Sequence, residues 1–123
     1  MSEIDELEGE ELTEAVARAR GWMSLPSLSG TGWLVYDAEK GATVRYQPHL
    51  NIAQAWGLVE LMRQDGYNLD PLRYYVRSTS PCTARFIHEE GAGLPWEAGF
   101  IGQGLTAPVA ICRAFLKAKA ASR

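Results

Sequence analysis

The stretch that decides the fold is LTAPVAICRAFLKAKA, residues 105–120. Thr106 can cap a helix with its hydroxyl, and Pro108 falls in the first turn, where a missing N–H removes no intrahelical bond. One side is apolar at helical spacing and comprises Leu105, Val109, Ile111, Cys112, Phe115 and Leu116. Three cations fall toward the other side, namely Arg113, Lys117 and Lys119. The pattern predicts a closing helix that buries one face against a sheet.

Two earlier helices are predicted. Residues 10–20 carry an apolar face of Leu12, Ala15, Val16 and Ala19, and Gly21 marks the end. Asn51 and Gln54 form a capping-box-like pair that opens a helix through about residue 65, before Gly66. The predicted buried face of this second helix consists of Ile52, Ala55, Trp56, Val59 and Met62.

Two strand pairs lie between the helices. WLVY at 33–36 and TVRYQ at 43–47 predict a hairpin, with Gly41 at the position that needs unusual backbone geometry. RYYVR at 73–77 and TARFIHE at 83–89 predict a second pair. Five glycines and one proline in the stretch from Glu90 to Gly104 predict a loop before the closing helix.

The predicted order is α-β-β-α-β-β-α, which belongs to the α+β class. Each helix has one apolar face to bury, so we expect an α/β/α sandwich. Its sheet has about four strands, antiparallel or mixed, flanked by three helices that cover both faces. At 123 residues, 46% of them apolar and 22% charged, the chain is predicted to form a single domain over residues 1–123.

The composition also predicts a cytoplasmic protein. No apolar run is long enough to cross a bilayer, and the acidic start does not resemble a secretory leader. Cys82 and Cys112 lack the spacing and the neighbouring histidine of a zinc site, so Cys112 is interpreted as a core residue. A disulfide between them is not expected in the cytosol.

The charge is unevenly distributed. Residues 1–14 hold seven acids and no base, whereas the rest holds eight acids and twelve bases, so the two segments carry −7 and +4. One interpretation is an acidic arm over about residues 1–9, without fixed structure, that repels nucleic acid or covers a basic surface. The other, which the usual behaviour of charge runs favours, is the solvated start of a helix, where acids suit the dipole.

Three segments carry a resemblance to a known family: Gly21–Trp22 at the end of the first helix, NIAQAWGLVELM at 51–62 and TAPVAICRAFLKA at 106–118. In these the chain resembles the phage ABA sandwich domain family of small phage and prophage proteins. The resemblance implies a helix, a sheet with an intervening helix and a final helix, in the host cytoplasm. It implies no activity, catalytic residue or cofactor.

Two patterns suggest anion binding. Gly102, Gly104 and Ala107 form a G-x-G-x-x-A string before a helix, but the acid that a dinucleotide site requires further on is missing, so a loop is the simpler interpretation. On the second hairpin, Arg73 and Arg77 alternate onto one face, and Arg85 joins them if the register permits. The alternative is that helices cover these arginines, which then pair with acids such as Glu60.

The remaining candidates are aromatic and imidazole side chains. His49 precedes a helix and His88 stands beside Glu89 and Glu90, yet neither has a nucleophile or a metal-ligand set nearby in sequence. Trp96 and Phe100 lie in the glycine-rich loop, and we predict them as a protein contact, with anchoring of the loop as the alternative.

The sequence therefore predicts no catalytic residue, metal site or cofactor. The favoured function is that of a non-enzymatic phage or prophage accessory protein that binds a host or phage protein or associates with itself. A small-ligand or nucleotide-binding protein, including an enzyme, that uses Arg73, Arg77 or Arg85 is the alternative. Nucleic-acid binding comes third, because the net charge is −3.

Overall fold

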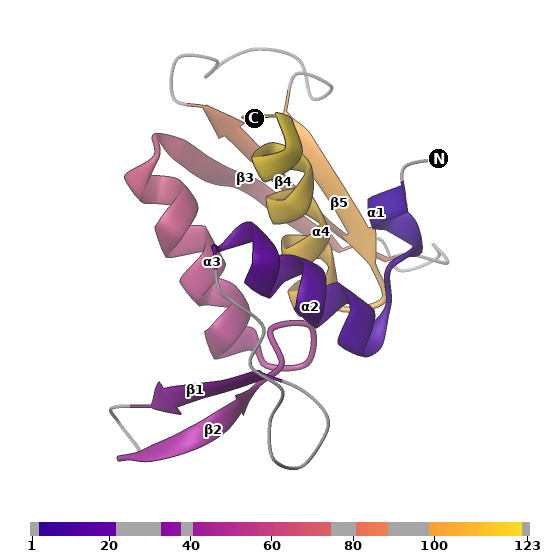
Figure 1. Cartoon of the computed structure of the whole chain (residues 1–123). Coiled ribbons are helices and arrows are strands. Elements are labelled where there is room, and N and C mark those ends of the chain that lie inside the picture. Colours follow the sequence, from indigo (N-terminus) through magenta and orange to yellow (C-terminus); the bar gives the residue numbers. More distant parts are fainter. Residues whose placement is uncertain (1–2, 22–32, 38–40, 75–80, 89–98, 122–123) are drawn as a thin grey trace.

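The computed structural model describes residues 3–21, 33–37, 41–74, 81–88 and 99–121. In chain order the elements are α1 (Glu3–Glu6), α2 (Gly9–Ala19), β1 (Trp33–Asp37), β2 (Ala42–Tyr46), α3 (Ile52–Gln64), β3 (Tyr67–Tyr74), β4 (Cys82–His88), β5 (Phe100–Gly104) and α4 (Ala107–Ala121). The α+β class and the three long helices are confirmed. One short helix and one strand are added to the predicted order (Figure 1).

The described strands form two antiparallel sheets. β1 and β2 pair as a separate hairpin, while β3, β4 and β5 form a three-stranded sheet with β4 in the centre. Antiparallel pairing was one of the two predicted arrangements. The strands are divided between two sheets, however, and do not form the single sheet that was expected.

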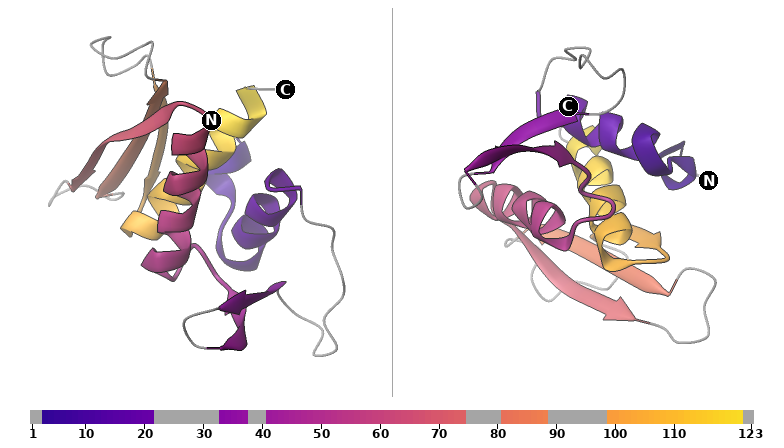
Figure 2. Two further views of the ribbon diagram at one scale, coloured as in Figure 1. Left: turned by 90° about the vertical axis from the view of Figure 1, so that its left-hand side faces the viewer. Right: turned by 90° about the horizontal axis from the view of Figure 1, so that it is seen from below.

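Both helices that pack on the three-stranded sheet lie on the same face. Helices α3 and α4 contact it side by side, and α2 packs against the opposite side of α4 (Figures 1 and 2). Within the described part of the chain the layers are thus sheet, helix pair and outer helix. The prediction placed helices on both faces of the sheet. The difference arises because α4 is apolar on more than one side and can bury itself between two layers.

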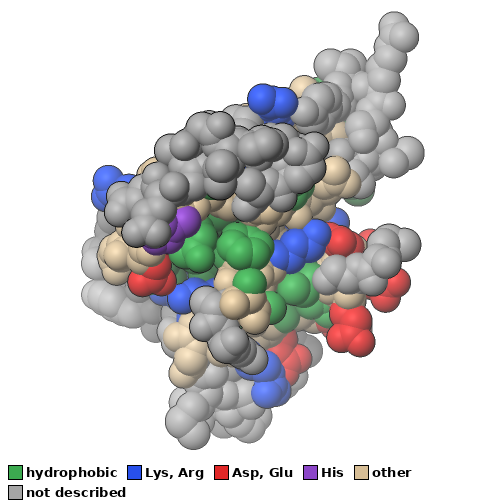
Figure 3. All heavy atoms as spheres, turned by 90° about the horizontal axis from the view of Figure 1, so that it is seen from above, with side chains coloured by type: hydrophobic (Ala, Val, Ile, Leu, Met, Phe, Trp, Pro, Cys, Tyr) green, Lys and Arg blue, Asp and Glu red, His purple; other side chains and the backbone are tan. Residues whose placement is uncertain are grey.

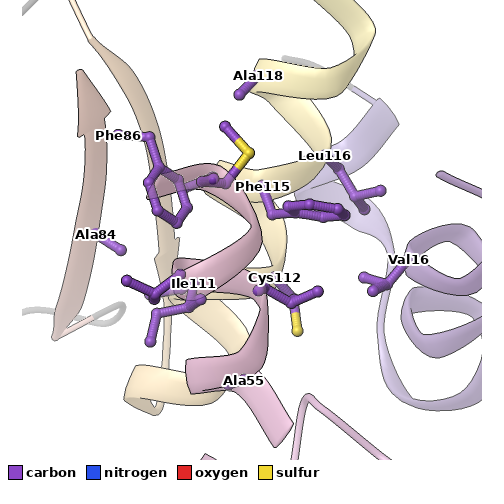
Figure 4. Packing of buried hydrophobic residues seen from close by; sticks show 14 of the residues in the cluster. Val16, Ala55, Ala84, Phe86, Ile111, Cys112, Phe115, Leu116 and Ala118 are labelled. Atoms are coloured by element: carbon purple, nitrogen blue, oxygen red, sulfur yellow. The ribbon is translucent and has the colours of Figure 1, made fainter. Parts of the chain in front are cut away.

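Helix α4 is the centre of the core. Phe86 reaches it from β4, and Leu116 of α4 lies beside Val16 of α2 (Figure 4). Its buried residues run around the helix: Ala110, Ile111, Cys112, Arg113, Ala114, Phe115, Leu116 and Ala118. The prediction that Arg113 lies on a solvent side is wrong, because α1 and α2 cover that side. Leu105, predicted in the buried stripe, precedes the helix and is 73% exposed.

Two glycines let β5 approach the backbone of α4. A Cβ on Gly102 would lie 2.3 Å from both the Ala110 carbonyl oxygen and the Ala114 nitrogen. A Cβ on Gly104 would lie 2.5 Å from a methyl carbon of Val109. The G-x-G-x-x-A string is therefore a packing feature. The predicted loop over 90–104 is wrong for its last five residues, which form β5.

The outer border of β5 is closed by cations from α4. Lys117 Nζ donates to the Ile101 carbonyl oxygen at 2.8 Å, and Arg113 Nη1 donates to that of Gln103 at 2.7 Å. Lys117 also pairs with Asp5 of α1 at 2.9 Å. Part of the acidic start is therefore helical and attached to α4 through Asp5.

Local signals placed the ends of α2 and α3 correctly. Gly21 and Gly66 both have positive φ, 84° and 87°, where glycine is favoured. The side chain of Asn51 accepts from the Gln54 N–H at 3.1 Å. Gln54 in turn donates through Nε2 to the Arg45 carbonyl oxygen at 3.0 Å, which attaches the end of β2 to the first turn of α3.

The strand predicted over residues 73–77 begins earlier in the chain than expected. β3 begins at Tyr67, directly after the turn at Gly66, and pairs with β4 along its length, with a register shift between Leu69 and Leu72. The first half of this strand was not predicted because it contains Asn68 and Asp70, and both residue types are poor strand formers. Residues 75–77 lie outside the described residues.

We predict that Gly102→Ala lowers the free energy of unfolding by about 1–3 kcal/mol, because the new methyl group would overlap the backbone of α4. Chemical denaturation of both proteins measures the difference. Gly57→Ala in α3 is the matched control. Nothing lies within 4 Å of its Cβ position, so alanine there should stabilise the helix by about 0.5–1 kcal/mol. Equal effects at the two positions would contradict the packing role of Gly102.

Candidate functional site

Of the three arginines predicted as an anion contact, Arg73 and Arg85 lie among the described residues. Arg73 pairs with Thr83 across the sheet, and Thr83 and Arg85 lie two residues apart on β4, so Arg73 and Arg85 share a face as the prediction required. Arg73 is exposed, but Arg85 is only 8% exposed and its stem packs against Gly99. Arg77 lies outside the described residues. The structure thus does not assemble an exposed group of these three.

Of the predicted aromatic contact, only Phe100 lies among the described residues. Phe100 is partly buried at the start of β5 and packs against the core, with its ring centroid 6.1 Å from that of Tyr67. Trp96 lies outside the described residues, as do Trp22 and the acids Glu89 and Glu90. Phe100 therefore acts as a core residue, and the role of Trp96 stays a prediction.

The two histidines have different surroundings. His49 is buried, and its Nδ1 lies 2.6 Å from the hydroxyl oxygen of Thr13, which is fully buried on α2. This bond joins α2 to the turn before α3 and has no access to a substrate. His88 packs edge-on against Tyr67, with ring centroids 5.1 Å apart, and its Nε2 lies close to Gly66.

His88 borders a shallow hollow of about 250 Å³ at the ends of α3 and α4, together with Met62, Asp65, Tyr67, Ala118 and Lys119. The Lys119 ammonium lies 3.4 Å from the Asp65 carboxylate, and both side chains are partly exposed to solvent. On this face the described acidic and basic side chains lie intermixed (Figure 3). The hollow contains a base but no aligned nucleophile among the residues that the structure describes.

Trp56 was predicted as a core residue and is 47% exposed. Ile52, one turn earlier on α3, is 52% exposed, and Leu50 just before the helix is 68% exposed. We call these three residues the α3 surface. The residues that α3 does bury are Ala55, Leu58, Val59 and Met62. The prediction was wrong for Ile52 and Trp56 because the helix is apolar on two adjoining sides, of which only one faces α4.

The largest of the hollows described here, about 480 Å³, lies between the α1–α2 junction and the start of α4. Arg113 lines it and is 9% exposed. Its Nη1 and Nη2 donate to the carbonyl oxygens of Gln103 and Leu7, the latter at 2.9 Å, while the buried Nε has no partner. A buried donor without an acceptor typically costs about 1–3 kcal/mol. We call this the Arg113 cavity; sequence reasoning missed it because Arg113 looked like a surface residue.

No group of three or more His, Cys, Asp or Glu side chains in the described parts of the chain is arranged to hold a metal ion. None of the helices in those parts is long and apolar enough to pass through a bilayer.

Comparison with known proteins identifies no matching family model, no similar curated protein and no similar solved structure.

Both cysteines are free thiols and buried. Burial raises the pKa of each, that of Cys112 to about 12 from an ordinary value of 9.0. Cys112 is a core residue, as predicted. It is not an activated nucleophile, because an activated thiol has a lowered pKa.

We predict that stability falls between about pH 9 and pH 12. In the unfolded chain the Cys112 thiol ionises above pH 9, whereas in the folded protein it keeps its proton up to about pH 12. The unfolded state then binds fewer protons, so stability decreases by up to about 1.4 kcal/mol per pH unit. Urea denaturation at a series of pH values measures this slope. Cys112→Ala should make the slope shallower, because the variant lacks this thiol. The slope should not vanish, because burial also raises the pKa values of Cys82 and Tyr46, which are present in both proteins. Identical slopes would contradict the prediction.

Proposed function

We propose that the protein is a non-enzymatic accessory protein of a phage or prophage, which works in the host cytoplasm by binding. The binding mode that the geometry supports best is self-association through the α3 surface. The resemblance of residues 51–62 and 106–118 to phage ABA sandwich domains supports the setting. The observation that supports this binding mode is the exposure of the Trp56 side chain.

An exposed tryptophan beside two exposed aliphatic residues is costly in water unless it is covered. Ile52 and Trp56 lie one turn apart and so form a continuous strip, which Leu50 extends. Large aromatic side chains dominate the energy of protein interfaces, and tryptophan is enriched among the residues that contribute most. The strip therefore has the composition of an interface centre.

The charges near this strip favour a second copy of the chain as the partner. The first turn of α3 contains no acid, so the positive end of its dipole is not neutralised there. The first fourteen residues of the chain carry −7. Among them Glu11 is exposed on α2. A second copy thus brings both an apolar strip and carboxylates that suit the positive end of α3.

We expect wild-type protein to show a concentration-dependent increase in sedimentation coefficient up to about 1 mM, the range in which an association worth about 4 kcal/mol is visible. Trp56→Lys and Ile52→Lys should abolish it, because each places a charge in the apolar strip. Higher salt should weaken it by screening the attraction between the acidic first fourteen residues of one copy and the start of α3 in the other.

Leu105→Lys is the matched control, because Leu105 is equally exposed but lies outside the α3 surface. It should associate like the wild type. A wild-type protein that remains monomeric throughout this range would overturn self-association, and an equal loss in Leu105→Lys would remove the α3 surface from the interface.

A further inference from the structure

Gly57 is a residue of α3 that the fold of one chain does not explain. It lies in the middle of the helix, is exposed, and has nothing within 4 Å of its Cβ position. Glycine is the least favourable residue inside a helix after proline, so it weakens α3 unless something requires the missing side chain. Every other glycine in the described segments has either a positive φ (Gly9, Gly21, Gly41 and Gly66) or a close neighbour (Gly99, Gly102 and Gly104).

Gly57 directly follows Trp56, the largest side chain of the α3 surface. Successive residues of a helix are rotated by about 100°, so the exposed indole stands beside bare backbone. A bulky side chain next to an empty position is complementary in shape to a second copy turned end for end. The Trp56 ring of each copy can then lie over the Gly57 backbone of the other, and a two-fold axis forms both contacts at once.

The electrostatics of α3 favour the same orientation. Its first turn contains no acid, so the start of the helix keeps its positive partial charge. Near its end, the acids Glu60 and Asp65 are paired with cations, at 2.7 Å with Arg63 and at 3.4 Å with Lys119. The negative partial charge of the helix end therefore remains. Antiparallel helices bring the positive start of each beside the negative end of the other, whereas parallel helices bring like ends together.

We propose that two copies associate through antiparallel α3 helices across a two-fold axis close to Gly57, with Trp56 of each copy packed over the Gly57 backbone of the other. This inference rests on the self-association proposed above and assigns its orientation. Gly57 is the residue that permits it, because a side chain at this position would hold the two helices apart.

Gly57→Leu tests the contact, with association measured by sedimentation up to about 1 mM. Leucine adds apolar surface, so an interface without fixed geometry would associate more strongly. Packing of Trp56 over Gly57 predicts instead that association weakens at least about tenfold. Gly57→Ala should weaken it several-fold although it stabilises the single chain, so that unfolding cannot explain the loss. Gln64→Leu, at an exposed position near the end of the same helix, is the matched control and should associate at least as strongly as the wild type.

Cysteine cross-linking tests the orientation. Cys82 and Cys112 are buried, so an introduced surface thiol is the one that reacts. In an antiparallel pair centred near residue 57, the two copies of residue 57 lie close together, whereas the two copies of residue 64 lie about 20 Å apart along the axis. A disulfide requires Cα atoms within about 7 Å. Gly57→Cys should therefore form a disulfide-linked dimer under mild oxidation, and Gln64→Cys should not.

The outcomes separate this arrangement from self-association itself. A wild-type protein that remains monomeric overturns self-association, and the arrangement with it. If the wild type associates and Gly57→Leu associates equally well, the α3 surface stands and the contact between Trp56 and Gly57 is wrong. Cross-linking of Gln64→Cys as fast as that of Gly57→Cys indicates parallel helices and also overturns the arrangement, as does failure of Gly57→Cys to cross-link.

Discussion

The close approach of β5 to α4 is the constraint on which the other contacts depend. With glycine at position 102, a strand can lie against the helix backbone at Ala110 and Ala114. The approach brings the carbonyl oxygens of β5 within reach of the cations of α4, and it leaves the opposite side of α4 free to receive α2. A larger residue would push the strand outward and separate both sets of contacts. The layer order therefore follows from the absence of one side chain.

Features set by neighbouring residues could be predicted from the sequence. The ends of α2 and α3 depend on Gly21, Gly66 and the Asn51 cap, and each acts within a few residues of its own position. The β1–β2 hairpin, β4 and the antiparallel pairing of β4 with the end of β3 followed from composition and turn signals in the same way. These features need no knowledge of the rest of the fold, which is why the α+β class could be read correctly.

Features set by distant partners could not be predicted. Trp56 and Met62 both belong to apolar sides of α3, and only the position of α4 determines which side is covered. The partners of Arg113 are two backbone carbonyl oxygens, at Leu7 and Gln103, and every residue type has such a group. No local pattern distinguishes a cation that finds these acceptors from one that remains in water. The α3 surface and the Arg113 cavity both depend on such distant partners. For that reason the sequence did not predict either of them.

The cations on the border of β5 also decide how the protein can meet its neighbours. An edge strand normally offers unpaired backbone groups to any extended chain, but here Lys117 and Arg113 occupy the carbonyl oxygens of Ile101 and Gln103. The other edge, β3, is interrupted by its register shift and by Pro71, which has no N–H to donate. Growth of the three-stranded sheet by strand addition is thus hindered at both of its edges. The self-association proposed above would therefore use the side chains of the α3 surface and not the strands of this sheet.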